Sequence, residues 1–283
     1  MLRLAIQSKG RLSDESTALL KEIGVSLDDS HRKFLLQAQG LPLELLYLRD
    51  DDIPQVVSDG TAALGIVGLN EVQERGLPVT IVKKLGFGNC RISLAVPKNA
   101  GYDGPQWFNG KRIATSYPNI LNRWLQGNGI DAKVQVITGS VEVAPAAGIA
   151  DAIFDIVSSG GTLVANGLLE VEKVFWSEAV LISAGNLGAK GEDILKEMLF
   201  RIDSAQVSRG KKYLLMNIPT AAVDEAIRII PAMRSPTIMP LAAEGWCSMH
   251  SVVDEADLWD KVKLLKAIGA EGILVLNIDK IIP

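Results

Sequence analysis

The sequence predicts an α/β protein with two similar lobes of parallel β-sheet, followed by a smaller unit of a different kind. Short apolar segments alternate with helix-compatible segments through the first 207 residues, and this β-α-β alternation is typical of parallel sheets covered by helices on both faces. The alternation occurs twice, over residues 1–91 and again over residues 92–179. Residues 208–283 instead follow the order β-α-β-β-α-β, which is typical of a ferredoxin-like unit.

The first lobe begins with a short apolar strand at residues 2–6. Ser13 is expected to cap a helix that ends near Gly24, because a serine side chain can accept a hydrogen bond from a free amide in the first turn. The chain is expected to return to this lobe after residue 179, so that the lobe comprises residues 1–91 and 180–207. Its other predicted elements are strands at 43–48, 63–67 and 180–183 and helices at 53–59 and 194–208.

The second lobe and the C-terminal unit are predicted from the same kind of pattern. In the second lobe, residues 92–179, strands are predicted at 92–96, 112–115, 132–137 and 152–157 and helices at 120–128 and 142–147. After a linker at 209–212, the C-terminal unit has predicted strands at 213–218, 237–241, 247–253 and 273–278 and helices at 221–230 and 256–268. The glycine-rich segment 185–191 is expected to be a loop.

The composition is that of an ordinary globular protein and excludes several functional classes. Of 283 residues, 48% are hydrophobic and 22% charged, and the net charge of −4 argues against a nucleic-acid binder. Cys90 and Cys247 lie far apart and form no C-x-x-C motif, which favours free thiols in a reducing compartment. The sequence shows neither a signal peptide nor an apolar run of the ~20 residues that a membrane span needs. We therefore expect a cytoplasmic protein without membrane contact.

A glycine- and hydroxyl-rich loop follows the predicted strand at 152–157. It consists of Ser158, Ser159, Gly160, Gly161 and Thr162, and a helix-compatible segment comes next. A strand, a glycine-rich turn and a helix start together bring backbone N–H groups toward an anion. The loop has neither the GK[ST] of a Walker A motif nor G-x-G-x-x-G spacing. It predicts a phosphate or pyrophosphate site, and the alternative is an ordinary surface turn.

Acidic residues near this loop suggest what else the ligand carries. Carboxylates beside a phosphate site repel the ligand unless a divalent cation or sugar hydroxyls bridge them. Glu142, Asp151 and Asp155 precede the loop, and the combination suggests a phosphorylated sugar bound with Mg²⁺. Asp155 lies nearer to the loop than Asp151 and is therefore the expected ligand of the ribose hydroxyls. Glu142 and Asp155 are also the predicted metal ligands. For Glu142, the alternative is an acid that only stabilises the first turn of a helix.

The segment around the loop also resembles a known family. EVAPAAGIADAIFDIVSSGGTL, at residues 142–163, resembles the signature of ATP phosphoribosyltransferases, the first enzymes of histidine biosynthesis. Further similar segments occur in order along nearly the whole chain: LAIQSKGRL, RDDDIPQVVSDGTAALGIVGLN, GKRIATSYPNI and SPTIMPLA. The resemblance implies a bilobed core like that of type II periplasmic binding proteins. Ser159 stands where threonine is frequent, and this change keeps the hydroxyl donor.

The resemblance implies that N1 of ATP attacks the anomeric carbon of phosphoribosyl pyrophosphate and displaces pyrophosphate with the help of Mg²⁺. Catalysis of this kind consists of aligning two charged ligands and neutralising the leaving group. Lys9, Arg11 and Arg32 are the cations expected to do so, and the loop at 158–162 is expected to hold the 5′-phosphate. Without the resemblance, Lys9 and Arg11 would fit a solvated turn and Arg32 an ordinary surface charge.

The expected ATP-binding residues lie at other strand ends. Gly10 would let the backbone approach a phosphate, Arg49 would face the phosphates, and Asp51 would bind ribose hydroxyls. Tyr117 would stack on adenine. The alternatives are a solvated acidic helix start for Asp51 and a half-buried strand-end residue for Tyr117.

The resemblance is to the long form of the family. It implies feedback inhibition by histidine on the C-terminal unit and a homodimer that assembles to a homohexamer. Asn217, Thr237 and Ser248 are the residues expected to bind histidine. The alternative is a unit that only mediates assembly. A non-catalytic sensor of phosphorylated solutes and an inactive regulatory paralogue are the competing classes for the whole chain.

Overall fold

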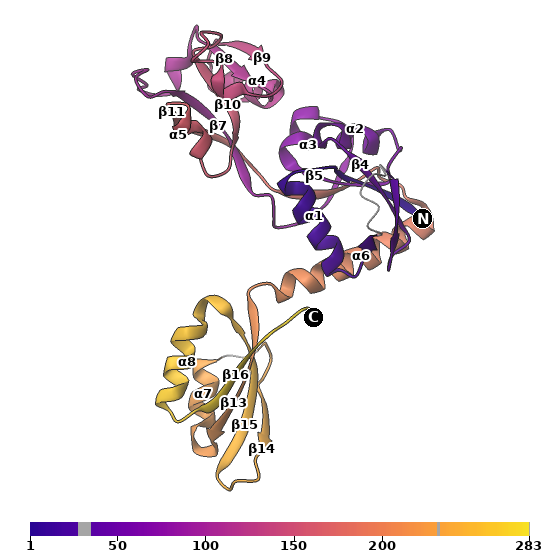
Figure 1. Cartoon of the computed structure of the whole chain (residues 1–283), viewed down its shortest axis with the longest axis vertical. Coiled ribbons are helices and arrows are strands. Elements are labelled where there is room, and N and C mark those ends of the chain that lie inside the picture. The colour runs from indigo at the N-terminus through magenta and orange to yellow at the C-terminus, as the bar shows by residue number, and fades with distance from the viewer. Residues whose placement is uncertain (28–34, 231–232, 283) are drawn as a thin grey trace. The chain divides into compact units, whose positions relative to one another are not determined.

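The computed structural model describes residues 1–27, 35–230 and 233–282 (Figure 1). The chain divides into two compact units, Met1–Leu195 and Lys196–Pro283. The division falls inside helix α6 (Gly188–Ser208), whereas the sequence placed the boundary after residue 207. In the part of the chain that the structure describes, no helix is both long and apolar enough to cross a bilayer.

The first unit contains two sheets, and we call the part around each sheet a lobe. Lobe I is built on the strand order β2-β3-β4-β1-β5-β12-β6. The neighbours of β1 run parallel to it, as the β-α-β pattern predicts, and β12 returns antiparallel between β5 and β6. The strands are β1 (Leu2–Gln7), β2 (Ser26–Leu27), β3 (Leu35–Gln39), β4 (Leu43–Leu48), β5 (Leu64–Gly68), β6 (Thr80–Lys84) and β12 (Ala179–Ser183), with helices α1 (Arg11–Glu22), α2 (Ile53–Ser58) and α3 (Leu69–Arg75).

Lobe II is built on the strand order β11-β7-β10-β8-β9. Strands β10, β8 and β9 are parallel, while β7 and β11 are antiparallel to their neighbours. An aromatic cluster around the fully buried Phe108 packs in the core of this lobe. The strands are β7 (Cys90–Pro97), β8 (Arg112–Thr115), β9 (Lys133–Val136), β10 (Ala152–Val157) and β11 (Leu168–Ser177), with helices α4 (Pro118–Gly127) and α5 (Gly161–Ala165).

The C-terminal unit confirms the predicted β-α-β-β-α-β order. Its antiparallel sheet has the strand order β14-β15-β13-β16. Helices α7 and α8 pack against one face of this sheet, which carries the apolar side chains of Leu214, Met216 and Met249. Alternation along β13 leaves Tyr213, Leu215 and Asn217 on the other face. The elements are β13 (Lys211–Pro219), α7 (Val223–Ile229), β14 (Thr237–Pro240), β15 (Trp246–Asp254), α8 (Leu258–Ala267) and β16 (Glu271–Asn277).

Several local expectations were wrong. Helix α1 begins at Arg11 with Gly10 at its N-cap position, so Ser13 lies inside the helix and does not cap it. Glu142 lies in a single 3₁₀ turn, Val141–Val143, and not in a helix over 142–147. Helix α6 begins at Gly188, within the expected loop. The sequence patterns also missed β2, β3, β6, β11 and α3.

Candidate functional site

The predicted phosphate loop lies between β10 and α5. Gly160 adopts a left-handed conformation, with φ of 85°, and directly precedes the helix. Ser158, Ser159 and Thr162 are exposed, so their hydroxyls are accessible to a ligand. A side chain at Gly160 would be strained at this φ, which explains a glycine at the turn.

Arg91 on β7 braces this loop, a role that sequence reasoning missed. Its Nη1 donates to the carbonyl of Ser158 at 3.1 Å, and its Nη2 donates to Oε2 of Glu170 at 2.6 Å. Ser93 Oγ donates to the same carboxylate at 2.7 Å. The hydrogen bond from Arg91 lowers the pKa of Glu170, which keeps the pair charged.

A pocket of about 480 Å³ opens beside the brace. Residues from both lobes line it, because the chain crosses between the lobes from β6 to β7 and from β11 to β12. Two cations, one acid and an exposed indole contribute to its walls. The lining residues are Lys84, Asn89, Cys90, Arg91, Ser158, Trp176, Ser177 and Glu178.

The structure separates the roles of the acids that precede the loop. Burial raises the pKa of Asp155 to about 6, and the charge of Glu142 adds to the effect, so these two carboxylates are electrostatically coupled. Asp151 instead accepts hydrogen bonds from the side chain and backbone of Arg112, which lower its pKa. Asp151 is thus part of a structural ion pair, and Asp155 and Glu142 remain the acids beside the loop.

The coupled pair Asp155 and Glu142 fits a site for Mg²⁺. Among residues 1–27, 35–230 and 233–282, no group of three or more His, Cys, Asp or Glu side chains is placed to hold a metal alone. Mg²⁺ in nucleotide and phosphate sites commonly uses one or two carboxylates together with water and substrate phosphates. Asp155, on the strand that leads into the loop, and Glu142, whose charge acts on it, match that number of carboxylates.

The loop after β1 carries the predicted cations and lies beside the end of β4. Ser8 N donates to the carbonyl of Leu48 at 2.7 Å, which joins the two strand ends. Lys9 and Arg11 are exposed, and Arg11 Nη2 donates to the carbonyl of Asn89 at 3.2 Å. Arg11 therefore reaches a residue that lines the pocket. Arg32 lies outside the described residues.

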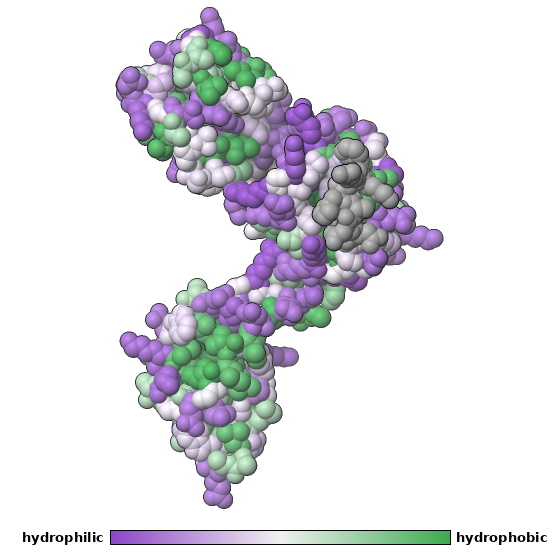
Figure 2. All heavy atoms as spheres, in the orientation of Figure 1, coloured by the Kyte–Doolittle hydropathy of each residue, from purple (hydrophilic) through white to green (hydrophobic). Residues whose placement is uncertain are grey.

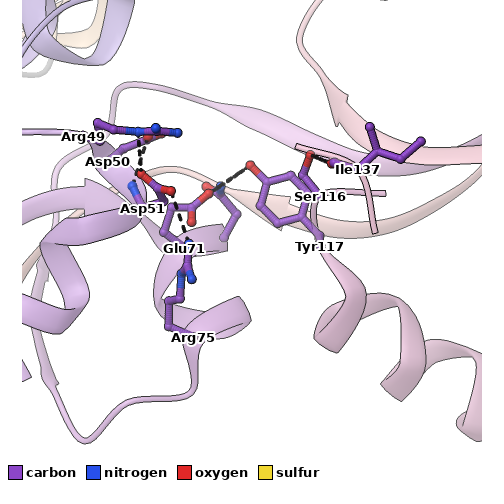
Figure 3. A network of polar contacts seen from close by, with 9 residues as sticks. Arg49, Asp50, Asp51, Glu71, Arg75, Ser116, Tyr117 and Ile137 are labelled. Carbon is purple, nitrogen blue, oxygen red and sulfur yellow. Dashed lines mark hydrogen bonds and ion pairs between the residues drawn. The ribbon is translucent and has the colours of Figure 1, made fainter. Parts of the chain in front are cut away.

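The segment after β4 holds its acids between arginines (Figure 3). Asp51 pairs with Arg49 at 3.2 Å and with Arg75 of α3 at 3.4 Å. Arg49 is the most exposed of the three side chains, at 77%. Arg49 is thus accessible to a ligand, while both Asp51 oxygens already face guanidinium groups.

Tyr117 lies where the two lobes meet, in a different setting from the one expected. Only 7% of it is exposed, and its ring packs in the core of lobe II. Its hydroxyl donates to Oε1 of Glu71 at 2.9 Å (Figure 3). The expected stacking on adenine is not supported by this geometry, because the ring is covered by the protein. Asn70 and Glu71, which contact the hydroxyl, were not identified from the sequence.

The residues expected to bind histidine lie on neighbouring strands of the C-terminal sheet. Asn217 of β13 is directly opposite Ser248 of β15, and Thr237 of β14 is opposite His250. Ser248 Oγ lies 3.1 Å from Nε2 of His250, and Tyr213 Oη lies 2.8 Å from its Nδ1. These side chains share the sheet face that points away from α7 and α8.

Comparison with known proteins gives a consistent result. A family model described as ATP phosphoribosyltransferase matches residues 49–204, and one described as HisG, C-terminal domain, matches residues 208–280. The curated ATP phosphoribosyltransferase of Bacteroides fragilis is 55% identical over 282 residues, covering 100% of both chains, and that of Cytophaga hutchinsonii is 50% identical, covering 100% of this chain and 99% of the relative.

A solved structure is also similar. It is the ATP phosphoribosyl transferase (HisG:HisZ) complex from Thermotoga maritima, which is 28% identical, with a TM-score of 0.63 over 72% of this chain and 96% of that one. The two family models together cover residues 49–204, which include the predicted phosphate loop, and residues 208–280 of the C-terminal unit. This chain belongs to the ATP phosphoribosyltransferase family, in the form that carries a C-terminal domain.

Proposed function

We propose that the pocket between the lobes transfers the 5-phosphoribosyl group of phosphoribosyl pyrophosphate to N1 of ATP and releases pyrophosphate, the first step of histidine biosynthesis. The observation that carries this proposal is the exposed phosphate loop, braced by Arg91 and adjoined by the coupled acids Asp155 and Glu142. Family membership gives the same activity. The substrates are metabolites of the cytoplasm, where we place the protein.

The reaction needs alignment and charge neutralisation more than proton transfer. The N1 lone pair of adenine forms the new bond to the anomeric carbon while the bond from that carbon to the pyrophosphate oxygen breaks. Because N1 is unprotonated at neutral pH, a general base has little to do. Negative charge grows on the leaving pyrophosphate, and fixed cations stabilise such charge in the transition state.

We assign the phosphoribosyl pyrophosphate subsite to the phosphate loop and the cations of the β1–α1 loop. The Ser158–Thr162 backbone and hydroxyls hold the 5′-phosphate, and Lys9 and Arg11 neutralise the pyrophosphate, with Arg32 as a further proposed cation. Glu142 and Asp155 would hold Mg²⁺, which supplies positive charge to the pyrophosphate oxygens when it is bound.

The ATP subsite is proposed at the neighbouring strand ends. Gly10 and Arg49 would contact the phosphates, and Asp51, which lies between Arg49 and Arg75, would accept from ribose hydroxyls. Tyr117 is proposed to lie beside this subsite, and it is not proposed to stack on adenine.

We further propose that histidine inhibits the enzyme at Asn217, Thr237 and Ser248 and that the chain forms a homodimer that assembles to a homohexamer. The three side chains lie on the sheet face that points away from α7 and α8, where Thr237 is exposed and Ser248 is 6% exposed. Large apolar side chains are exposed on this unit, including Leu274 at 54% and Leu276 at 49%, and Figure 2 shows hydrophobic surface gathered there. Such surface favours assembly with further copies.

The test is turnover of purified protein with ATP, phosphoribosyl pyrophosphate and Mg²⁺, followed by the near-ultraviolet absorbance of the N1-substituted adenine, with and without histidine. Turnover that histidine suppresses supports both assignments. Turnover that histidine does not change removes the histidine site and leaves the C-terminal unit an assembly role. Ligand binding without turnover contradicts the proposed reaction.

A further inference from the structure

Helix α3 of lobe I is fastened to the start of helix α4 in lobe II by polar contacts. The two carboxylate oxygens of Glu74 accept from the backbone N–H groups of Asn119 and Ile120 at 2.8 and 2.9 Å. Asn119 Nδ2 and Arg123 Nη2 donate back to the carbonyls of Glu74 and Gln73. Because these amides are the free donors of a helix start, α3 serves as the cap of α4 and ties the two lobes together.

A buried chain of hydrogen bonds continues from this junction. Oε1 of Glu71 accepts from the Tyr117 hydroxyl at 2.9 Å and from Asn70 Nδ2 at 3.0 Å (Figure 3). Asn70 Nδ2 also lies 3.2 Å from the Tyr117 oxygen, and Asn70 Oδ1 accepts from Ser177 Oγ at 2.7 Å. Tyr117 and Ser177 belong to lobe II and Asn70 and Glu71 to lobe I, so the chain passes from one lobe to the other and back.

Glu71 occupies its place at a cost in stability. Only 5% of the residue is exposed. Burial, together with the charges of Asp50 and Asp51 in the segment between β4 and α2, raises its pKa to about 7, although the Tyr117 hydroxyl and Arg75 act in the opposite direction. A neutral side chain of similar shape would avoid this cost. Acids with strongly shifted pKa values are concentrated at functional sites.

The position of the Tyr117 hydroxyl connects this chain of contacts to the reacting groups. Burial raises the pKa of Tyr117, and the negative charges of Glu71, Asp155 and Asp50 add to the effect. The hydroxyl is therefore under the electrostatic influence of Asp155, on the strand before the phosphate loop of lobe II, and of Asp50, in the segment of lobe I where the ATP subsite is proposed. Its hydrogen bonds to Glu71 and Asn70 join it to lobe I.

We propose that Glu71 is a positioning residue for the transfer reaction: its carboxylate holds the Tyr117 hydroxyl and so keeps the substrate-binding loops of the two lobes in register. This inference rests on the proposed function, because the proposed substrate subsites are built from loops of both lobes. The ionised carboxylate is the stronger acceptor, since hydrogen bonds to charged groups exceed neutral ones. The register is therefore held best when Glu71 is ionised.

The kinetic test compares Glu71→Gln and Tyr117→Phe with the wild type, and Glu197→Gln serves as a control for removal of an exposed acid. A shift of about 1 Å between reacting groups can lower turnover by up to about 100-fold. We expect kcat to fall by at least about tenfold in both variants, with each substrate's KM changed by less than about threefold. The double variant should be no worse than either single one, because the two groups act as one pair.

Two readouts separate this role from a merely structural one. The wild-type kcat should rise with pH through the region near 7 where Glu71 ionises, and the Glu71→Gln variant should lack that rise. Hydrogen–deuterium exchange of the segment 116–121, corrected for intrinsic rates, should show more protection in the wild type above pH 7 than below, and none of this dependence in the variant. The exchange measurement needs no turnover, so it tests the contact even if the proposed reaction fails.

Folded Glu71→Gln protein with wild-type kcat, an unchanged pH profile and unchanged exchange would overturn the proposal. If Glu71→Gln does not fold, Tyr117→Phe removes the same contact and is judged by the same kcat and exchange criteria. Loss of thermal stability with wild-type kcat in either folded variant would also overturn it, because that result leaves Glu71 a structural role alone.

Discussion

Replacing Arg91 by methionine should weaken binding of phosphoribosyl pyrophosphate, because it removes the side chain that braces the phosphate loop. The guanidinium pairs with Glu170 through two nitrogens, and both side chains are largely covered, at 18% and 19% exposure. Removing one partner of an exposed pair lowers the free energy of unfolding by ~0–1 kcal/mol, and removing one partner of a buried pair lowers it by ~3–5 kcal/mol. For this partly covered pair we expect a loss of about 2 kcal/mol.

The hydrogen bond to the Ser158 carbonyl determines how much of this loss reaches the ligand. A hydrogen bond from a charged group contributes about 1.5–3 kcal/mol, and its loss frees the first residue of the phosphate loop. The freed loop must then be ordered by the ligand. If this ordering costs about 1.4 kcal/mol of binding free energy, the KM for phosphoribosyl pyrophosphate rises about tenfold. The KM for ATP should change by less than about threefold, since Arg91 braces only the loop of lobe II.

Steady-state kinetics with each substrate varied in turn provide the assay, and Arg112→Met provides a matched control. Arg112 pairs with Asp151 and donates to the carbonyl of Gly148 in the same lobe, and neither partner belongs to the phosphate loop. We expect this control to lose stability and keep both KM values. Equal effects of Arg91→Met on both substrates, or no effect on either, would refute the reasoning.

Three further substitutions test other parts of the account. Arg11→Ala should lower kcat by about 100-fold with an unchanged melting temperature, because Arg11 is exposed and makes one hydrogen bond to the Asn89 carbonyl; a folded variant with normal turnover would remove its role. Thr162→Ala should raise the KM for phosphoribosyl pyrophosphate about fivefold, the effect of one neutral hydrogen bond, and an unchanged KM would place Thr162 outside the subsite. Burial raises the pKa of Glu71 from 4.5 to about 7. The folded protein is therefore most stable, as far as Glu71 is concerned, below pH 4.5, where the side chain is protonated, and it loses that stability as the pH rises through 7. Urea unfolding should therefore show Glu71→Gln gaining up to about 3 kcal/mol on the wild type between pH 4.5 and 8, whereas parallel pH curves would contradict the buried charge.

Much of the fold could be predicted because several strands are short apolar runs with polar ends. Strands β4, β8 and β10 have the predicted bounds. Strand β11 was missed because it is half-exposed and irregular, with register shifts between Glu170 and Glu172 and between Lys173 and Phe175 that break the alternation. Helix α3 was missed because its buried acids resemble surface charges in a sequence.

The Ser158–Thr162 loop and the Lys9–Arg11 segment follow strands β10 and β1, as the sequence predicts, and ligands bind at such strand ends in open α/β sheets. That these segments bind substrate stays a prediction. Long-range pairs could not be located in this way. Arg91 and Glu170 are 79 residues apart, and Tyr117 and Glu71 are 46 apart, so no local pattern joins them. Tyr117 shows the consequence: its motif suggested a ligand contact, and only the folded chain shows that its hydroxyl has a protein partner.

The most direct test of the central claim is the identity of the product. The protein would be incubated with ATP, phosphoribosyl pyrophosphate and Mg²⁺, with the product analysed by mass spectrometry and NMR and pyrophosphate measured in parallel. We predict an adduct in which the ribose 5-phosphate is bonded to N1 of ATP, formed in equal amounts with pyrophosphate. Pyrophosphate release without this adduct, or attachment at another atom of ATP, would contradict the account.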